Sequence, residues 1–475
     1  MERIRTRFAP SPTGMMHVGN LRSAIFEYLV AKHNHGDFIL RIEDTDQTRK
    51  VEGAIDFIYN TCHLCGLDPD EGPNNGGSYG PYVQSERLAL YQEYALKLVE
   101  IGKAYYCFCS EERLEKLRAD AEVNKIPFLY DGLCKHFTKE EALAKISQGE
   151  TYVIRQNMPK EGISTYTDLV YGDITVENKF LEDQILLKSD GYPTYNFANV
   201  IDDHLMAITH VIRGNEYLSQ TPKYNFIYDS FGWDKPTYIH LPMVVDADGK
   251  KLSKRDGASS FMDLYDKGYL PAGVVNYLSL LGWSPETTDE IFTLDELILK
   301  FNPARINKSP AVYDIKKLNW INAHYIKKLT LDELLLITIP HLKNSYDLTK
   351  KSEEWLRELV TIYQNHISYG AEIVEVTDLF FKEYIEITGE ALDFMADPEI
   401  PHTLMIFKDE IEKITDWTID NINLAIVNTK EKSGVKGKML YMPIRIKVSG
   451  QMHGPELPDT IHLLGKPVIL NRLSK

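Results

Sequence analysis

The stretch Pro10-Ser11-Pro12-Thr13-Gly14-Met15-Met16-His17-Val18-Gly19-Asn20 decides how the amino-terminal part of the chain folds. Residues 4–8 before it predict a short strand, and its prolines and glycine end regular structure. A helical pattern follows, with apolar side chains at Leu21, Ala24, Ile25, Tyr28 and Leu29. Residues 38–42 predict a second strand, and this strand–helix–strand order is typical of a parallel α/β sheet.

The same stretch has the properties of a phosphate site. It opens a helix, and a helix N-terminus offers backbone N–H groups and a partial positive charge to an anion. Gly19 would let a phosphate or a flat base approach the backbone closely, and His17 could donate a hydrogen bond to a developing negative charge. The alternative is a proline-rich loop that leads into an ordinary helix, with His17 as its cap.

A second stretch lies far downstream and reads Asp246-Ala247-Asp248-Gly249-Lys250-Lys251-Leu252-Ser253-Lys254-Arg255. It gathers four cations in a short loop that a glycine introduces. Such a loop can close over a triphosphate and neutralise charge that moves to a leaving pyrophosphate. Taken alone, the same letters are more typical of a solvated, lysine-rich turn.

The composition is that of a globular protein. The 475 residues are 43% hydrophobic and 26% charged, and this length predicts about three domains. These values exclude a disordered chain, a collagen-like repeat and a membrane bundle, and no apolar run reaches the ~20 residues that span a bilayer. Five cysteines do not make a disulfide framework, which favours a reducing cytoplasm. The net charge of −16 restricts any polyanion site to a local basic patch.

Together the two stretches indicate one protein family far more specifically than either stretch does alone. Ser-Pro-Thr-Gly-x-x-His-Val-Gly at residues 11–19 and Lys-Leu-Ser-Lys-Arg at residues 251–255 resemble the two signatures of class I aminoacyl-tRNA synthetases. With Arg-Ile-Glu-Asp-Thr-Asp at residues 41–46 and Val-Ile-Arg-Gly-Asn-Glu at residues 211–216, the chain is similar to bacterial-type glutamyl-tRNA synthetases. The similarity covers essentially the whole chain, including Gly-Gln-Met-His-Gly-Pro at residues 450–455.

The resemblance implies a multidomain α/β plus all-α protein. Its parts are a Rossmann-like parallel-sheet catalytic domain, an inserted acceptor-binding domain and a C-terminal helical anticodon-binding region. The helical pattern of the last third agrees, because Trp355, Leu356, Leu359, Val360 and Tyr363 fall on one helical face. The expected segments are 1–84 for the first half of the catalytic domain, 85–185 for the inserted acceptor-stem-binding domain with a possible zinc site, 186–260 for the second half with the Lys-Leu-Ser-Lys-Arg loop, 261–325 for a connecting stem-contact segment, and 326–475 for the helical anticodon-binding region.

The resemblance also implies a two-step reaction of ATP, L-glutamate and tRNA(Glu). The glutamate carboxylate attacks the α-phosphorus of ATP and releases pyrophosphate, and a terminal ribose hydroxyl of the tRNA then attacks the activated carbonyl. Such chemistry depends on positioning and charge stabilisation rather than on a covalent nucleophile. By resemblance the transition-state contacts are His17, Lys251 and Lys254, with Mg²⁺ accompanying the ATP. The implied ATP-binding residues are Pro10, Thr13, Gly14, His17, Gly19, Asn20, Glu216, Lys251, Ser253, Lys254 and Arg255.

Recognition of glutamate requires cations for two carboxylates and an acceptor for the ammonium group. Arg7 and Arg213 can each form bidentate pairs with a carboxylate, and Glu43 can receive the ammonium group. The resemblance implies that the glutamate site consists of Arg7, Ala9, Ser11, Glu43, Tyr195, Asn199, Arg213 and Tyr217. Without the family match, Arg41, Glu43, Asp44 and Asp46 would be read as a surface ion-pair cluster.

Three cysteines in the insertion suggest a structural zinc site. Cys107-x-Cys109, followed by Cys134-x-His136, can supply the four ligands of tetrahedral zinc. Some relatives resemble this pattern but use a tyrosine as the fourth ligand, which would be Tyr130 here. The alternative is three reduced cysteines in a packed insertion. The separate pair Cys62 and Cys65 is more typical of core residues on a helix.

Several alternatives remain at this stage. The enzyme could be non-discriminating and charge tRNA(Gln) as well as tRNA(Glu), or it could modify a tRNA base with glutamate. It could also be an RNA-independent nucleotidyltransferase with the same ATP signatures, or a catalytically inactive RNA-binding protein. The long helical region beyond residue 325 argues against base modification, and the intact signatures argue against an inactive protein. We expect a monomer that does not bind membranes.

Overall fold

The computed structural model describes residues 3–49, 51–126, 128–250, 252 and 260–474. The chain forms two compact units. The first consists of Met1–Asp263 and Val275–Ile315, and the second consists of Leu264–Val274 and Lys316–Lys475. The predicted combination of α/β and all-α parts is confirmed, because the first unit carries the sheets and the second is helical. Among the described residues, no helix is both long and apolar enough to cross a membrane.

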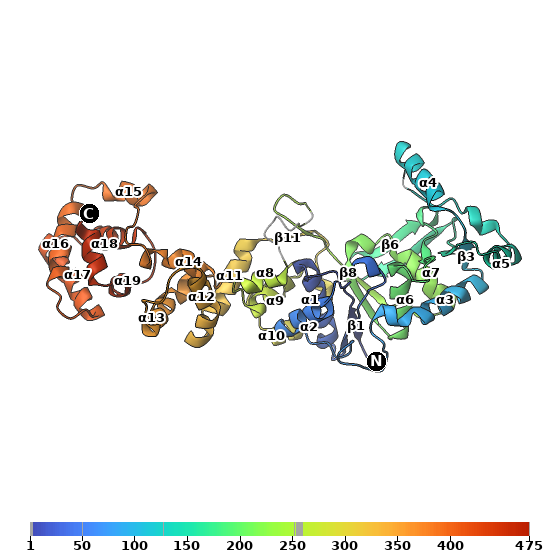
Figure 1. Cartoon of the computed structure of the whole chain (residues 1–475), viewed down its shortest axis with the longest axis horizontal. Helices are drawn as coiled ribbons and strands as arrows, with labels where there is room; N and C mark the ends of the chain where they lie inside the picture. Colours follow the sequence, from blue (N-terminus) through green and yellow to red (C-terminus); the bar gives the residue numbers. More distant parts are fainter. Residues whose placement is uncertain (1–2, 50, 127, 251, 253–259, 475) are drawn as a thin grey trace. The chain divides into compact units, whose positions relative to one another are not determined.

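The strand–helix–strand unit predicted for the amino terminus is present. Strand β1 (Arg5–Phe8) pairs in parallel with β2 (Asp37–Leu40), and helix α1 (Val18–His33) connects them (Figure 1). The predicted apolar stripe of α1 faces the core, where Leu21, Ala24, Ile25 and Leu29 are fully buried. Gly36 permits the tight return into β2, because a Cβ there would lie 2.1 Å from the carbonyl oxygen of Ile4.

The rest of the parallel sheet comes from much later in the chain. Strand β8 (His210–Gly214) pairs in parallel with β9 (Thr237–Leu241), and β5 (Ile163–Asp168) and β6 (Gly172–Glu177) extend this sheet in the order β6-β5-β9-β8. Strand β1 runs alongside β8 in the same direction, because the Thr209 N–H donates to the Arg5 carbonyl at 3.0 Å and Arg7 reaches the Ile212 carbonyl. The carboxyl ends of these parallel strands therefore meet at one edge, where open α/β sheets bind ligands.

An antiparallel sheet interrupts the parallel one. It consists of β3 (Ala104–Cys107), β4 (Val153–Gln156) and β7 (Ile185–Leu187), with helices α3 (Leu88–Glu100), α4 (Glu111–Val123) and α5 (Lys139–Ser147) (Figure 1).

A clasp at Asp202 holds the root of this insertion. Asp202 lies on helix α6 (Tyr195–Leu205), which follows the insertion. It accepts hydrogen bonds from Gln84 at 2.9 Å, Arg87 at 2.7 Å and Tyr91 at 2.8 Å, the residues at which the insertion begins. Asp202 thus fixes the start of the insertion to the helix that follows it, while β5 and β6, which lie between these two points in the sequence, belong to the sheet of β8 and β9.

The first unit is completed by elements around the parallel sheet. Helix α2 buries Cys62 fully and Cys65 follows it with 5% exposure, so the predicted core role of this pair is confirmed. The remaining elements are α2 (Ala54–Leu64), α7 (Thr221–Phe231), β10 (Val244–Val245), α10 (Leu294–Lys300) and β11 (Ala311–Val312). The division between the units passes through α8 (Phe261–Asp266) and α9 (Pro271–Ser279).

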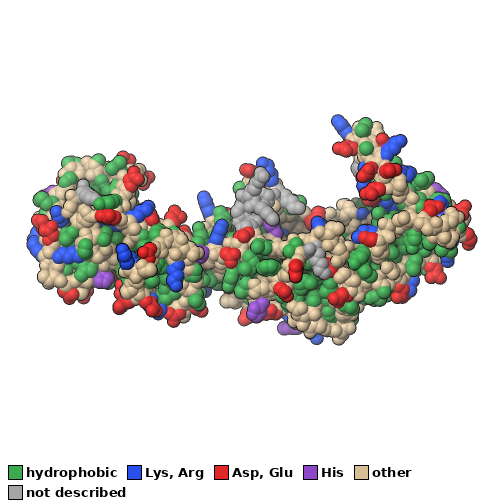
Figure 2. Space-filling model, in the orientation of Figure 1, with side chains coloured by type: hydrophobic (Ala, Val, Ile, Leu, Met, Phe, Trp, Pro, Cys, Tyr) green, Lys and Arg blue, Asp and Glu red, His purple; other side chains and the backbone are tan. Residues whose placement is uncertain are grey.

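The second unit is a set of packed helices. The predicted apolar face of α13 is confirmed, because Leu359, Val360 and Tyr363 are buried in its core and the Trp355 indole N–H donates to the Leu463 carbonyl at 3.0 Å. On the face shown in Figure 2, acidic and basic side chains are interspersed. The helices are α11 (Ile315–Ile326), α12 (Leu331–Ser345), α13 (Glu353–Tyr363), α14 (Glu372–Thr377), α15 (Gly389–Met395), α16 (Ile400–Glu412), α17 (Ile419–Ser433), α18 (Lys438–Ser449), α19 (Leu457–Leu464) and α20 (Lys466–Ser474).

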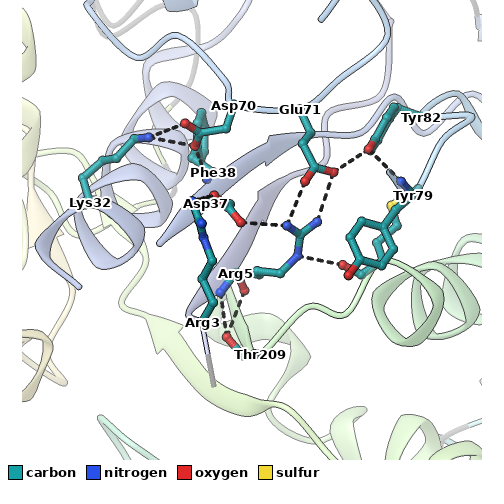
Figure 3. Close-up of polar contacts among 11 residues, drawn as sticks. Arg3, Arg5, Lys32, Asp37, Phe38, Asp70, Glu71, Tyr79, Tyr82 and Thr209 are labelled. Carbon is teal, nitrogen blue, oxygen red and sulfur yellow. Dashed lines mark hydrogen bonds and ion pairs between the residues drawn. The ribbon is translucent and has the colours of Figure 1, made fainter. Parts of the chain in front are cut away.

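A buried arginine ties the amino-terminal ends of the strands together. The Arg5 guanidinium donates to Asp37 at 2.8 Å and to both carboxylate oxygens of Glu71 at 2.8 and 3.1 Å (Figure 3). Its Nε donates to the Met206 carbonyl at 3.0 Å, and the ring of Tyr79 covers its face at 4.4 Å. Arg5 thus connects β1, β2, the loop after α2 and the end of α6.

Replacing Arg5 by alanine should destabilise the protein by about 3 kcal/mol, because the buried carboxylate of Asp37 and the partly buried carboxylate of Glu71 lose their shared cation. Urea unfolding followed by circular dichroism measures this change. Arg3→Ala is the matched control, since Arg3 also pairs with Asp37 but its side chain is 67% exposed. That exposed pair should contribute no more than ~1 kcal/mol. Equal losses in the two variants would contradict the role given to Arg5.

Candidate active site

Two adjoining cavities of about 370 and 430 Å³ lie at the carboxyl ends of the parallel strands. They share a wall, which consists of Ser11, Thr13, Glu43, Arg49, Tyr195 and Tyr217. The loop after β1, the segment after β2, the start of α6 and the segment after β8 each contribute to it. The edge of the sheet at which the parallel strands end is therefore hollowed into one continuous site.

Most of the residues expected at a glutamate site line these cavities. They are Arg7, Ala9, Ser11, Glu43, Tyr195, Arg213 and Tyr217. Asn199 is not among the lining residues; it is buried one turn after Tyr195 on α6, and its amide nitrogen has no hydrogen-bond partner among the described residues. Of the expected ATP-binding residues, Pro10, Thr13, Asn20 and Glu216 line the smaller cavity.

A network of buried charged side chains connects residues that line this site. One carboxylate oxygen of Asp203 accepts from Arg7 at 3.0 Å and from Arg41 at 2.7 Å. Arg41 in turn donates to Glu43 at 3.1 Å. Burial opposes ionisation of Asp203, but Arg7 and Arg41 outweigh it and hold the pKa of Asp203 below its ordinary value. Arg41, Glu43 and Asp44 are at most 4% exposed, so their interpretation as a surface ion-pair cluster is wrong, whereas Asp46 is exposed and pairs with Arg49 at 2.8 Å.

Two carboxylates at the cavity keep an oxygen without a partner. The second oxygen of Glu43 and one oxygen of Glu27 are buried and have no hydrogen bond among the described residues. Burial raises the pKa of Glu43 to about 7, although Arg41 and Arg7 act against the rise. Burial likewise raises the pKa of Glu27 well above its ordinary value, with Arg7 opposing. Both groups would gain from a cation entering the cavity.

Arg213 enters the cavity from the end of β8 inside an aromatic cage. The rings of Tyr224, Tyr217 and Tyr238 lie 4.6, 5.0 and 5.6 Å from its guanidinium carbon. Aromatic faces attract a cation and take no hydrogen bonds from its edges. The cage therefore holds the plane of the Arg213 guanidinium, while its Nε donates to His240 at 3.2 Å and its Nη2 donates to Thr221 at 2.7 Å.

The structure gives His17 the capping role that the sequence offered as an alternative. His17 is the N-cap of α1, and its Nδ1 accepts the N–H of Gly19 at 3.1 Å. A ring that accepts at Nδ1 carries its hydrogen on Nε2, which keeps a donor on the imidazole. Gly14 adopts φ of +126°, a conformation that L side chains rarely adopt, so the loop before the helix requires glycine there.

For the second cationic stretch, the structure describes mainly the residues on either side of it. Lys251, Ser253, Lys254 and Arg255 lie outside the described residues. Before them, Asp246 closes a turn by accepting the N–H groups of Asp248 at 2.9 Å and Lys250 at 2.8 Å. After them, Ser260 forms a β-bridge with His17, and the Phe261 N–H donates to the Met16 carbonyl at 3.0 Å. The loop therefore returns directly beside the amino-terminal motif, although the two are far apart in sequence.

The three cysteines of the insertion gather as a cluster. The sulfurs of Cys107, Cys109 and Cys134 all lie within 4.8 Å of one another, and Cys109 and Cys134 are 3.6 Å apart. The Tyr130 hydroxyl lies 3.4 Å from the sulfur of Cys107 and 3.2 Å from that of Cys109. Hydrogen bonding, first from Cys134, lowers the pKa of the Cys107 thiol. His136 is exposed and does not belong to this cluster.

Sequence reasoning missed several groups that build the site. Asp203, Glu27 and His240 are each at most 4% exposed and connect to Arg7 or Arg213. The signal for Asp203 is an acidic residue on the inner face of an amphipathic helix. The signal for His240 is a single polar residue within the apolar strand Tyr-Ile-His-Leu at residues 238–241. Neither pattern identifies the partner, because each pairing joins segments far apart in the chain.

Two family models match the chain. The model described as tRNA synthetases class I (E and Q), catalytic domain, matches residues 3–320, and the model described as anticodon binding domain matches residues 331–475. The chain is 50% identical to the glutamate–tRNA ligase of Clostridium botulinum (strain Eklund 17B / Type B), a match that covers 100% of this chain and 98% of that protein. It is 49% identical to the glutamate–tRNA ligase of Clostridium acetobutylicum, covering 99% and 97%.

Solved structures agree with these matches. The crystal structure of a glutamate tRNA ligase from Elizabethkingia meningosepticum in complex with its amino acid is 33% identical, with a TM-score of 0.86, covering 100% of this chain and 99% of that one. The glutamate-tRNA synthetase of Elizabethkingia anophelis is 32% identical, with a TM-score of 0.88 and the same coverage. This chain therefore belongs to the class I (E and Q) tRNA synthetases, in the glutamate–tRNA ligase family.

Proposed function

We propose that the cavity at the carboxyl ends of the parallel strands is where this glutamate–tRNA ligase binds L-glutamate and activates it with ATP. One observation carries the proposal: two buried arginines, Arg7 and Arg213, and the buried carboxylate of Glu43 line a single cavity of about 370 Å³. Two cations and one anion are the complement of an amino acid with two carboxylates and one ammonium group.

Each of these three charges has a partner in glutamate. Arg213, fixed in its cage, can pair with one carboxylate, and Arg7 supplies positive charge for the other. The oxygen of Glu43 that has no partner among the described residues can accept a hydrogen from the ammonium group. A substrate without one of these charges would leave a buried group unpaired, and that penalty gives strong discrimination.

Activation of glutamate places ATP between the two signature stretches. The glutamate carboxylate attacks the α-phosphorus and pyrophosphate leaves; Mg²⁺ bound with the ATP would supply further positive charge for the phosphates. The Nε2–H of His17, together with Lys251 and Lys254, would stabilise charge on the phosphates, with Gly14, Gly19, Ser253 and Arg255 completing the ATP site. The return of the loop at Ser260, paired with His17, supports this arrangement.

The other segments would hold the tRNA. We assign residues 85–185, except for β5 and β6, which belong to the sheet of β8 and β9, to the acceptor stem, 261–325 to the stem contact and 326–475 to the anticodon of tRNA(Glu). The terminal ribose hydroxyl of the tRNA then attacks the activated carbonyl and releases AMP. Charging of tRNA(Gln) in addition is the alternative, and the assay below includes it.

Arg213→Ala should raise the KM for glutamate about 10–100-fold, because a charge-assisted hydrogen bond in a buried site contributes about 1.5–3 kcal/mol. The KM for ATP should stay within about twofold, since the change removes no ATP contact. Aminoacylation of separated tRNA(Glu) and tRNA(Gln) with labelled glutamate measures both constants and the tRNA preference. The control is Arg49→Ala, which removes an exposed cation from the same cavity wall. A glutamate KM unchanged by Arg213→Ala would contradict the assignment.

The use of glutamate should depend on the ionisation of Glu43. Because the pKa of Glu43 is about 7, its carboxylate is mostly protonated at pH 6 and mostly charged at pH 8. Only the charged form attracts the ammonium group, so kcat/KM for glutamate should fall about tenfold per pH unit below 7. The matched control is Glu43→Gln, whose kcat/KM should be low and lack this acid limb. A wild-type profile that is flat from pH 6 to 8 would rule out the assigned role.

We further propose that the cysteine cluster is a structural zinc site. Two sulfurs on one tetrahedral zinc are separated by about 3.8 Å, given Zn–S bonds of ~2.3 Å, and Cys109 and Cys134 already lie 3.6 Å apart. Cys107, Cys109 and Cys134 would be three ligands. The position of the Tyr130 hydroxyl against two of the sulfurs supports it as the fourth ligand in preference to His136. Zinc here would stabilise the insertion by joining β3 to the segment before α5.

The purified protein should contain about one zinc per chain, and Cys109→Ser and Tyr130→Phe should each lower that content and the melting temperature. His136→Ala is the control and should retain the metal. Elemental analysis and differential scanning fluorimetry give both readouts without an activity assay. Full zinc in Tyr130→Phe with loss in His136→Ala would transfer the fourth position to the histidine.

A further inference from the structure

Arg213 is held along one edge of its guanidinium group. Its Nε donates to Nε2 of His240 at 3.2 Å, and its Nη2 donates to the Thr221 hydroxyl at 2.7 Å. Thr221 is fixed in turn, because its hydroxyl donates to the Tyr217 carbonyl at 2.9 Å. Since Nε and Nη2 form the side edge of an arginine, this contact directs the opposite edge, at Nη1, away from His240 and Thr221.

His240 can serve as that acceptor only in one tautomer. Its Nδ1 lies 2.7 Å from a carboxylate oxygen of Asp168, which can only accept, so the ring hydrogen is on Nδ1 and Nε2 presents a lone pair to Arg213. Asp168 also accepts three backbone N–H groups, from Val170, Tyr171 and His240, at 2.8 to 3.1 Å. A carboxylate with four donors is locked in place.

The groups that hold Arg213 are buried away from solvent. Asp168, Thr221 and His240 are at most 1% exposed. The three groups come from the end of β5, the start of α7 and the end of β9, so the regular elements around Arg213 all help to hold it. The ring of Tyr238 stacks near His240 at 6.2 Å, with Tyr166 on a tilted contact at 6.4 Å.

We propose that His240 and Asp168 are positioning residues that set the direction of Arg213, so that its Nη1 edge meets a carboxylate of the bound glutamate. The proposal rests on the function proposed above, in which Arg213 binds glutamate. It explains why a histidine stands in an apolar strand: the site needs an acceptor for Nε that carries no charge of its own. A carboxylate directly on Arg213 would neutralise the cation that the substrate requires.

The test compares two replacements of His240 by steady-state aminoacylation. His240→Phe keeps a ring between the tyrosines but removes the acceptor, and it should raise the KM for glutamate about tenfold with kcat and the KM for ATP within about twofold. His240→Gln offers one acceptor and one donor, as the neutral imidazole does, and should restore the glutamate KM to within about twofold of wild type. Melting temperatures of both variants identify any loss of fold.

A pH profile supplies a readout that does not depend on His240→Phe folding. Burial lowers the pKa of His240, against the pull of Asp168, so its protonation and the loss of the acceptor come on the acid side of the ordinary value of 6.5. The other charged and titratable groups around the ring are Arg213, Glu216, Tyr166 and Tyr238. They and Glu43 are the same in His240→Gln. The ratio of the glutamate KM of wild type to that of His240→Gln should therefore rise as the pH falls below 6.5.

The outcomes separate this inference from the proposed function. If Arg213→Ala raises the glutamate KM and well-folded His240→Phe does not, the positioning role is overturned and the glutamate site stands. Equal losses in His240→Phe and His240→Gln would also overturn it, as would a KM ratio that stays constant with pH. If Arg213→Ala leaves the glutamate KM unchanged, the assignment of Arg213 fails and this inference fails with it.

Discussion

The catalytic half of the molecule depends on one shared acid. Asp203 accepts from Arg7 and Arg41, which stand 196 and 162 positions before it in the sequence. Each arginine alone would be a buried cation at high cost, and Asp203 alone a buried anion. Together they join β1, the end of β2 and α6, so the walls of the cavity assemble only when both halves of the interrupted domain are folded.

This network also sets the charge that the cavity presents. Arg7 and Arg41 face Asp203, Glu43 and Glu27, so the acids outnumber the bases on this side. Burial raises the pKa values of Glu43 and Glu27, so protonation of these two groups relieves the excess of negative charge until a cation enters the cavity. Arg213, at the end of β8, is the further cation of the cavity, and uncharged partners and aromatic rings fix it. The site is therefore polarised before any ligand arrives, which is how a preorganised site limits reorganisation.

Sequence reasoning reached the parts of the molecule that local patterns encode. The Pro-Ser-Pro-Thr-Gly loop predicted the strand–helix–strand unit, the apolar stripe of α1 and the cavity at the end of β1. It could not reach Asp203 or His240, because their roles come from pairings between different strands and helices, which local patterns do not encode. Arg41 shows the same difficulty: charge and spacing suggested a surface pair, and only the three-dimensional fold shows it fully buried. For His17, the structure shows the cap, in which Nδ1 accepts the Gly19 N–H, and this cap is compatible with the phosphate contact proposed for Nε2.

The Asp202 clasp has an evolutionary meaning. Because Gln84, Arg87 and Tyr91 meet one carboxylate on α6, the chain that departs there comes back to the same spot. The ends of the excursion are pinned, so its length hardly matters to the host: doubling a loop adds only about 0.6 kcal/mol of closure entropy. The part of the excursion from α3 to β4 can therefore change in length without refitting the parallel sheet, whereas β5 and β6 belong to that sheet and have to keep their place.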